Sequence, residues 1–237
     1  MNKNSAKKLV VFENVGFWMV ALLLLAFIGF WDSYFSKLFV SNSGFNIYFH
    51  FHAVMAVLWI VVLIVQPILI RHKKWIVHKQ VGFAAHFLLA LFFISVILLT
   101  HYQQSNAERA NFIGVFIPFK DLLVISVAYF IAMKNSHVVG IHARGMIVTG
   151  IAMIEPALIR ALGVLFPSLD NRYVWTILIV YSVLIFFIII SRQYKKGRWV
   201  FPLILALYLP IHSVSIFKLP VGLFKNFADW FVGLPLT

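Results

Sequence analysis

Nine histidines and six methionines are the side chains best able to bind a transition metal, because the 237-residue sequence contains no cysteine. The absence of thiolates excludes disulfides, iron–sulfur clusters and cysteine nucleophiles, so any metal chemistry must use imidazole, carboxylate or thioether groups. Five of the histidines lie within or close to long apolar runs, where they could bind a buried cofactor. They are His52, His86, His101, His142 and His212.

Two kinds of cofactor fit these histidines. Bis-histidine ligation of haem b needs two imidazoles at matching depth on facing helices. His52 matches His101 or His212 in depth, and His86 matches His142. The alternative is a zinc, copper or iron ion held by two or three histidines and a carboxylate. Its candidate ligands are His52, His101, Asp121, Glu155 and His212.

Charged side chains also fall inside apolar runs, where ionisable groups are costly and commonly functional. Four of them stand out, namely Lys120, Asp121, Glu155 and Arg160. These groups could relay protons or bind a substrate, or they could neutralise one another in helix packing. Pro156 lacks a backbone donor and predicts a kink directly after Glu155.

Membrane-spanning helices must position these groups, because 62% of the residues are hydrophobic and only 11% are charged, which excludes a soluble globular domain. A helix that crosses the hydrocarbon needs about 20 mostly apolar residues. Seven runs fit, and they cover residues 15–35, 48–70, 81–100, 112–133, 146–166, 173–190 and 199–217. We therefore predict an all-α polytopic bundle with seven transmembrane helices.

The remaining segments add no second domain. Residues 219–236 contain two prolines, two glycines and two charged residues, and predict an amphipathic interfacial tail rather than an eighth span. No repeat or soluble segment divides the chain, so residues 1–237 are expected to form a single transmembrane domain. His50 points about 200° away from His52 on a regular helix, and we expect it to be solvated at the membrane surface.

The formal net charge of +13 carries information about orientation. With a cytoplasmic N-terminus, thirteen of the twenty Lys and Arg fall in inner segments, five in outer segments and two inside spans. Because cationic segments stay on the cytoplasmic side, we predict a cytoplasmic N-terminus and an outside C-terminus in a bacterial inner membrane. The expected partners are the bilayer, anionic lipid at the cytoplasmic rim and a membrane protein or second copy, with no nucleic acid.

A longer pattern runs through most of the chain. It consists of His50-x-His52, Trp59, Gln66-Pro67, Arg71, His78-x-x-x-Gly82, Pro118-x-x-Asp121, His142-x-Arg144-x-Met146 and Arg160. This pattern resembles a group of uncharacterised multi-pass bacterial membrane proteins, and the resemblance implies a shared fold and a shared site. A looser likeness over residues 48–166 is to cytochrome b561-type haem proteins. It is carried by His52-x-x-Met55 and by Lys74-x-x-x-His78, and it implies haem binding.

We therefore expect a polar site of histidines and carboxylates in the outer half of the bundle, with a metal- or haem-binding redox role as the first hypothesis. A small proton-coupled transporter or permease is the alternative, and an accessory subunit of a membrane complex is the third. No catalytic residue can be named, because neither a serine nucleophile paired with histidine nor a phosphate-binding glycine loop is recognisable.

Overall fold

The computed structural model describes residues 14–38, 45–107, 111–217, 219 and 222–237, and these residues form helices and connecting turns with no strand. Every predicted apolar run overlaps a helix or, in one case, two helices in succession, although the run 15–35 is α-helical only as far as Gly29. The elements are α2 (Val15–Gly29), η1 (Phe35–Lys37), α3 (Ile47–Arg71), α4 (Trp75–Ser105), α5 (Phe112–Lys134), α6 (Val139–Ala152), α7 (Ile154–Leu165), α8 (Arg172–Ser191), α9 (Val200–Ile216) and α10 (Gly222–Val232).

Five helical stretches in the described chain are long and apolar enough to cross a membrane. They are α3, α4, α5, the α6–α7 pair and α8. Two further apolar helices are shorter, since α2 has 15 residues and α9 has 17. The all-helical fold is thus confirmed for the described residues, and five of its stretches suit a membrane, whereas seven crossings stay a prediction.

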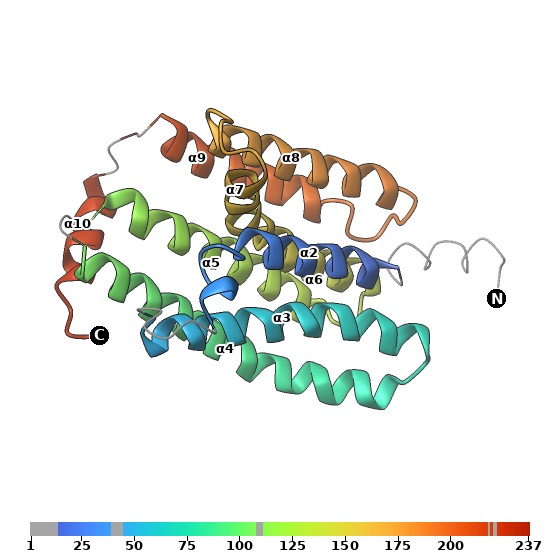
Figure 1. The fold of residues 1–237 in the computed structure, drawn as a ribbon. Helices are drawn as coiled ribbons and strands as arrows, with labels where there is room; N and C mark the ends of the chain where they lie inside the picture. The colour runs from blue at the N-terminus through green and yellow to red at the C-terminus, as the bar shows by residue number, and fades with distance from the viewer. Residues whose placement is uncertain (1–13, 39–44, 108–110, 218, 220–221) are drawn as a thin grey trace.

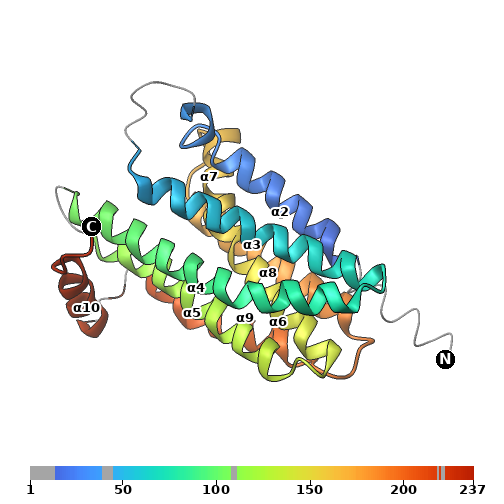
Figure 2. The same ribbon diagram turned by 90° about the horizontal axis from the view of Figure 1, so that it is seen from below.

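Successive helices run up and down in an antiparallel bundle (Figures 1 and 2). At one end of the bundle α10 packs beside α4 and α5, and we refer to this as the α10 end (Figure 1). We refer to the opposite end as the basic end. Ten basic residues belong to it, namely Arg71, Lys73, Lys74, Lys79, Lys134, Arg144, Arg192, Lys195, Lys196 and Arg198. The α10 end carries Lys37, Arg172 and Lys225 in the described residues.

The α6–α7 pair is a single membrane-spanning stretch that is interrupted near its middle. Pro156 has no N–H, so the carbonyl of Ala152 loses its partner four residues on. The backbone N–H of Met153 bonds instead to the Gly150 carbonyl at 3.0 Å, and α7 starts afresh in a different direction (Figure 1). The kink predicted at Pro156 is therefore present, and it places Glu155 in the first turn of α7.

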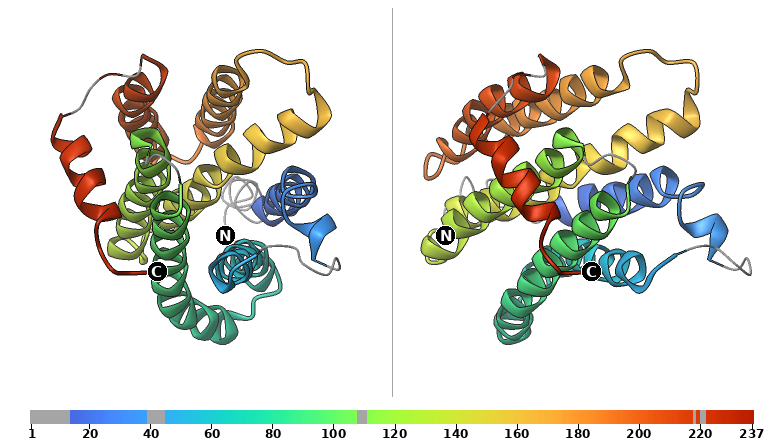
Figure 3. Two further views of the ribbon diagram at one scale, coloured as in Figure 1. Left: turned by 60° about the vertical axis from the view of Figure 1, so that its left-hand side comes forward. Right: turned by 90° about the vertical axis from the view of Figure 1, so that its left-hand side faces the viewer.

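This broken stretch is the most buried of the five, with 61% of its apolar part inside the protein. Its second half, α7, lies between α2 and α8 (Figure 3), and its first half, α6, packs mainly against α5. Gly29 allows α2 to approach α7 closely, because a Cβ atom at this position would collide with the backbone carbonyl of Ala157. The absence of a side chain at Gly29 therefore sets the distance between these two helices.

The predicted interfacial tail forms the amphipathic helix α10, which packs against α5. The ring of Phe231 is buried and lies edge-on to Phe119, with centroids 5.1 Å apart, and Phe224 packs in the same way on Phe116 at 5.1 Å. Trp230, at 60% exposure, faces outward. The helix is thus bound to the bundle on one face and leaves an aromatic ring for the interface on the other.

Candidate functional site

Four ionisable side chains from three helices meet in the interior, and we name Lys120, Asp121, Glu155 and His212 the ionic network. The Lys120 ammonium lies between two carboxylates, with Nζ 2.7 Å from Asp121 Oδ1 and 2.8 Å from Glu155 Oε1. The other carboxylate oxygen of Glu155 lies 3.1 Å from His212 Nε2. The network therefore connects α5, α7 and α9 through Glu155.

The ionic network is shielded from solvent. The side chains of Lys120 and His212 are each 1% exposed, and that of Glu155 is 3% exposed. Charges at such depth are stable only when they are paired and hydrogen-bonded. The position of Glu155 adds a favourable term, because the first turn of α7 presents the positive end of a helix dipole to the carboxylate.

Three tyrosines complete the surroundings of His212. Tyr208 stacks on the imidazole with centroids 4.7 Å apart and an interplanar angle of 12°. The Tyr181 hydroxyl lies 3.0 Å from Nδ1, so both ring nitrogens of His212 have partners. Tyr173 approaches the ring edge-on at 6.4 Å. These contacts fix the imidazole plane and direct Nε2 toward Glu155.

A cavity of about 570 Å³ leads from the α10 end to the ionic network, and we name it the polar cavity. Its walls come from the ends of α2, α4 and α8, the beginning of α5 and the length of α7. Several lining side chains are polar or charged, namely Asp32, Gln103, Gln104, Arg160, Arg172 and Tyr173. Glu155 also lines it, so the same carboxylate faces the cavity and the network.

The two arginines of the polar cavity have no carboxylate within 4.0 Å among the described residues. Arg160 donates to the carbonyl of Pro156 at 2.8 Å, and its guanidinium lies 4.6 Å from the centroid of the Phe30 ring. Arg172 donates to two backbone carbonyls in the turn that precedes α8. Both guanidinium groups therefore bring positive charge to the cavity without a direct carboxylate partner in the described chain, while the carboxylates of Asp32 and Glu155 line other parts of its wall.

The structure brings together three of the five predicted metal ligands and separates the other two. Asp121, Glu155 and His212 belong to the ionic network, where the Lys120 ammonium occupies the place between the carboxylates. His52 instead stacks on Phe92 and pairs through Nδ1 with Ser95 Oγ at 3.2 Å. His101 Nδ1 pairs with Thr237 Oγ1 at 2.7 Å. Among the described residues, no group of three or more histidines and carboxylates could hold a metal ion.

The remaining predicted residues lie elsewhere. His50 pairs with the Tyr34 hydroxyl at 2.8 Å near the α10 end, where its predicted surface position agrees with its partial exposure. His86 and His142, predicted as one haem pair, line a second cavity near the basic end. The predicted pair of His86 and His142 thus shares one cavity, whereas His52, His101 and His212 each have different partners.

Sequence reasoning missed the three tyrosines and the burial of one arginine. The spacing of Tyr208 and His212 by four residues could have indicated a shared helix face. Arg144, one of the thirteen basic residues predicted in inner segments, lies at the basic end but is fully buried, and it donates to the backbone carbonyls of Gly140, Ser191 and Lys196. It therefore terminates α8 and holds the following turn.

Comparisons with known proteins found no match, so a function for this chain must be inferred from the geometry described above. No protein-family model matches the chain, no curated protein is similar to it, and no solved structure resembles its fold.

Proposed function

We propose that this chain spans a bacterial inner membrane seven times, with the N-terminus in the cytoplasm and the C-terminus outside. Ten basic residues at one end against three at the other, within the described chain, support this orientation. At 1.5 Å per residue, α2 and α9 rise about 22 and 26 Å, which approaches the hydrocarbon thickness of about 30 Å. In this orientation the polar cavity opens outside.

We further propose that the protein is a proton-coupled transporter of a small polar solute. The observation that carries this proposal is the buried ionic network at the inner end of the polar cavity. With His212 neutral, the network holds one positive charge on Lys120 and two negative charges on Asp121 and Glu155. A net buried charge is costly in a membrane, so one proton bound between Glu155 and His212 balances the set.

The polar cavity supplies the solute site in this proposal. Arg160 and Arg172 favour an anion, because their guanidinium groups have no carboxylate partner in the described chain and fit carboxylate or phosphate oxygens. An anion beside Arg160 would lie close to the Glu155 carboxylate. The two negative groups would repel each other, and a proton on Glu155 would relieve this repulsion. Proton binding at Glu155 and solute binding at Arg160 would therefore favour each other.

Proton flux in liposomes tests the proposal. The purified protein is reconstituted into liposomes that contain a pH-sensitive dye. A potassium diffusion potential set with valinomycin drives the flux, and lactate or phosphate is added outside. We expect solute-dependent acidification that is lost in the double variant Asp121→Asn with Glu155→Gln. His212→Gln, which leaves Lys120 paired, should also abolish it. Asp170→Asn, at an exposed turn, is the matched control and should behave as wild type.

Unchanged proton flux and unchanged solute uptake in both the double variant and His212→Gln would overturn the transporter proposal. The solute site has its own test in Arg160→Gln, which should raise the solute concentration needed for half-maximal uptake by about tenfold, since a charge-assisted pair is lost. Equal half-maximal concentrations in wild type and Arg160→Gln would remove the anion from the proposal.

A further inference from the structure

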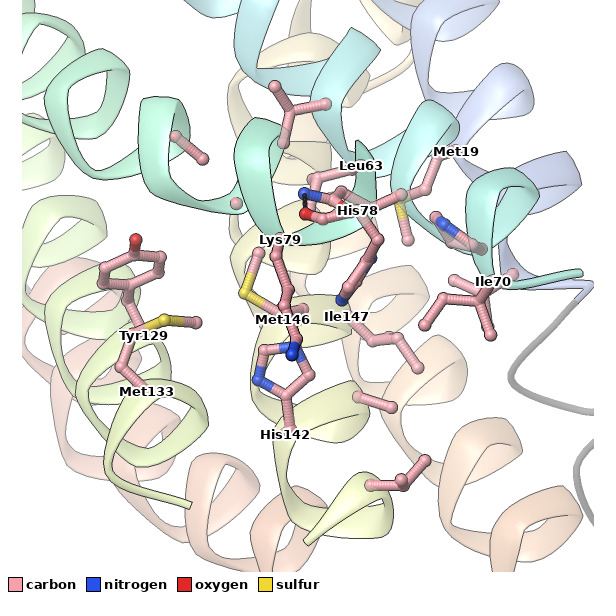
Figure 4. Close-up of a pocket in the computed structure, with 18 of the residues that line it drawn as sticks. Met19, Leu63, Ile70, His78, Lys79, Tyr129, Met133, His142, Met146 and Ile147 are labelled. Atoms are coloured by element: carbon pink, nitrogen blue, oxygen red, sulfur yellow. Dashed lines mark hydrogen bonds between the residues drawn. The ribbon is translucent and has the colours of Figure 1, made fainter. Parts of the chain in front are cut away.

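A second cavity, of about 330 Å³, lies near the basic end and is separate from the polar cavity (Figure 4). We name it the histidine cavity, because His78, His86 and His142 line it. Most of its wall is apolar and includes Met19, Leu63, Met133, Met146 and Ile147, contributed by α2, α3, α5 and α6. Its size lies within the range of small-molecule sites.

Three polar atoms on this wall are buried and have no hydrogen-bond partner in the described chain. They are Gln66 Oε1, His78 Nδ1 and the Tyr129 hydroxyl. The Gln66 amide nitrogen donates to the His78 backbone carbonyl at 3.2 Å, which holds the side chain in place. Because each unmet buried polar atom is costly, three of them in one cavity indicate a ligand that supplies their partners.

The two other histidines present hydrogen-bond acceptors. His86 Nδ1 lies 2.8 Å from the Gly82 carbonyl, and His142 Nδ1 lies 3.1 Å from the Ala132 carbonyl. A carbonyl only accepts, so Nδ1 carries the hydrogen in both rings, and Nε2 of the neutral imidazole is left with a lone pair. The ligand therefore meets acceptors at these rings and at Gln66, and a donor at Tyr129.

The position of these groups restricts the shape of the ligand. Tyr129 lies on one side of the cavity and His78 on the other, with Met146 between them (Figure 4). A molecule with polar groups on two opposite sides of an apolar ring satisfies both sides, whereas a fatty acid has a polar group at one end only. None of the lining residues in the described chain is acidic, and Lys79 is exposed, which favours an uncharged ligand.

The cavity is open toward the lipid-facing surface of α4. Phe83, which lines it, is 69% exposed, and His86 on the next turn is also exposed. We propose that the histidine cavity binds a lipid-soluble quinol, which enters from the bilayer. Its ring lies among the methionines. One of its hydroxyl groups pairs with the Tyr129 hydroxyl, and the other donates a hydrogen bond to Gln66 Oε1 or His78 Nδ1 on the opposite side. This inference does not depend on the proposed transport.

Binding of a short-chain ubiquinol, kept reduced, to the purified protein in detergent tests the inference. Trp59 packs against Tyr129 with ring centroids 5.8 Å apart, so quinol binding should change the tryptophan fluorescence. We expect Tyr129→Phe and Gln66→Leu each to raise the dissociation constant by about tenfold, as for a lost buried hydrogen bond. Tyr102→Phe and the exposed Gln80→Leu are the matched controls and should bind as wild type.

A photoreactive quinol gives a second measurement that uses the wild-type protein. Labelling of peptides that contain Tyr129 or Met146, suppressed by excess ubiquinol, would support the site. Equal affinity in all five proteins, labelling elsewhere, or displacement of the probe by oleate but not by ubiquinol would overturn it. Haem that co-purifies and protects these same peptides from the label would overturn it as well.

Discussion

Replacing Lys120 with methionine should be the most damaging single change in the ionic network. The ammonium lies 2.7 Å from Asp121 Oδ1 and 2.8 Å from Glu155 Oε1, and both contacts are buried. Its removal leaves two carboxylates facing each other, of which His212 can neutralise one. Breaking a buried ion pair from one side costs about 3–5 kcal/mol, and we expect Lys120→Met to lower the free energy of unfolding by this amount.

Charge balance predicts that a second substitution rescues the first. Asp121→Asn alone leaves Lys120 paired with Glu155 and should cost only about 1.5–3 kcal/mol, the value of one hydrogen bond to a charged group. In the double variant with Lys120→Met, Glu155 still pairs with His212, so no carboxylate is left without a cation. The double variant should therefore be more stable than Lys120→Met by about 2 kcal/mol.

Unfolding of the four proteins in mixed micelles, followed by tryptophan fluorescence, gives the double-mutant cycle. Lys225→Met removes an exposed lysine from α10 and serves as the control, with an expected change below about 0.5 kcal/mol. The reasoning fails if the two substitutions destabilise additively, or if Lys120→Met costs no more than Lys225→Met. Either result would mean that the network carries little electrostatic energy.

Three further predictions concern packing and topology. Arg144→Met should lower the free energy of unfolding by about 2–4 kcal/mol, measured as above, because several backbone carbonyls lose a buried donor; a loss below 1 kcal/mol would contradict its capping role. Gly29→Leu should lower the melting temperature, whereas Gly222→Leu, with open space around it, should not. Since the chain lacks cysteine, Lys195→Cys and Lys225→Cys should react with an impermeant maleimide only from the cytoplasm and only from outside, respectively; the reverse pattern would invert the orientation.

The haem or metal site predicted from the histidines stays a prediction, and so does the accessory-subunit role. An absorption spectrum and an elemental assay of the purified protein decide the first. A Soret band or stoichiometric metal would support it, and the lack of both would refute it. A partner that co-purifies in stoichiometric amount would support the second.

The sequence sufficed for the helices but not for their mutual arrangement. Apolar run length is a local property, so the helix positions and the kink at Pro156 could be predicted directly. Depth also follows from the rise per residue, and it correctly placed Asp121, Glu155 and His212 at one level. Which residues touch depends in addition on helix order and rotation, which no local pattern records.

His101 shows this limit most clearly. Its depth agreed with a shared outer site, yet its partner Thr237 lies 136 residues further along the chain. Nothing in the apolar runs indicates that the tail returns to the end of α4. The burial of Arg144 was missed for a related reason, because its neighbours in sequence indicate a surface position. Its partners come from the end of α8 and the turn that follows.

The break at Met153 makes α7 a short separate helix that carries both Glu155 of the ionic network and Arg160 of the polar cavity. Glu155 lies in the first turn of α7, next to the break, whereas Arg160 lies about one and a half turns further along the helix. Helix α7 packs closely against α2 at Gly29, rather than against the α5 helix that bears Lys120. If α7 tilted together with α2 about the break at Met153, Arg160 would therefore move further than Glu155. A small change at the ion pair would then produce a larger displacement at the cavity wall.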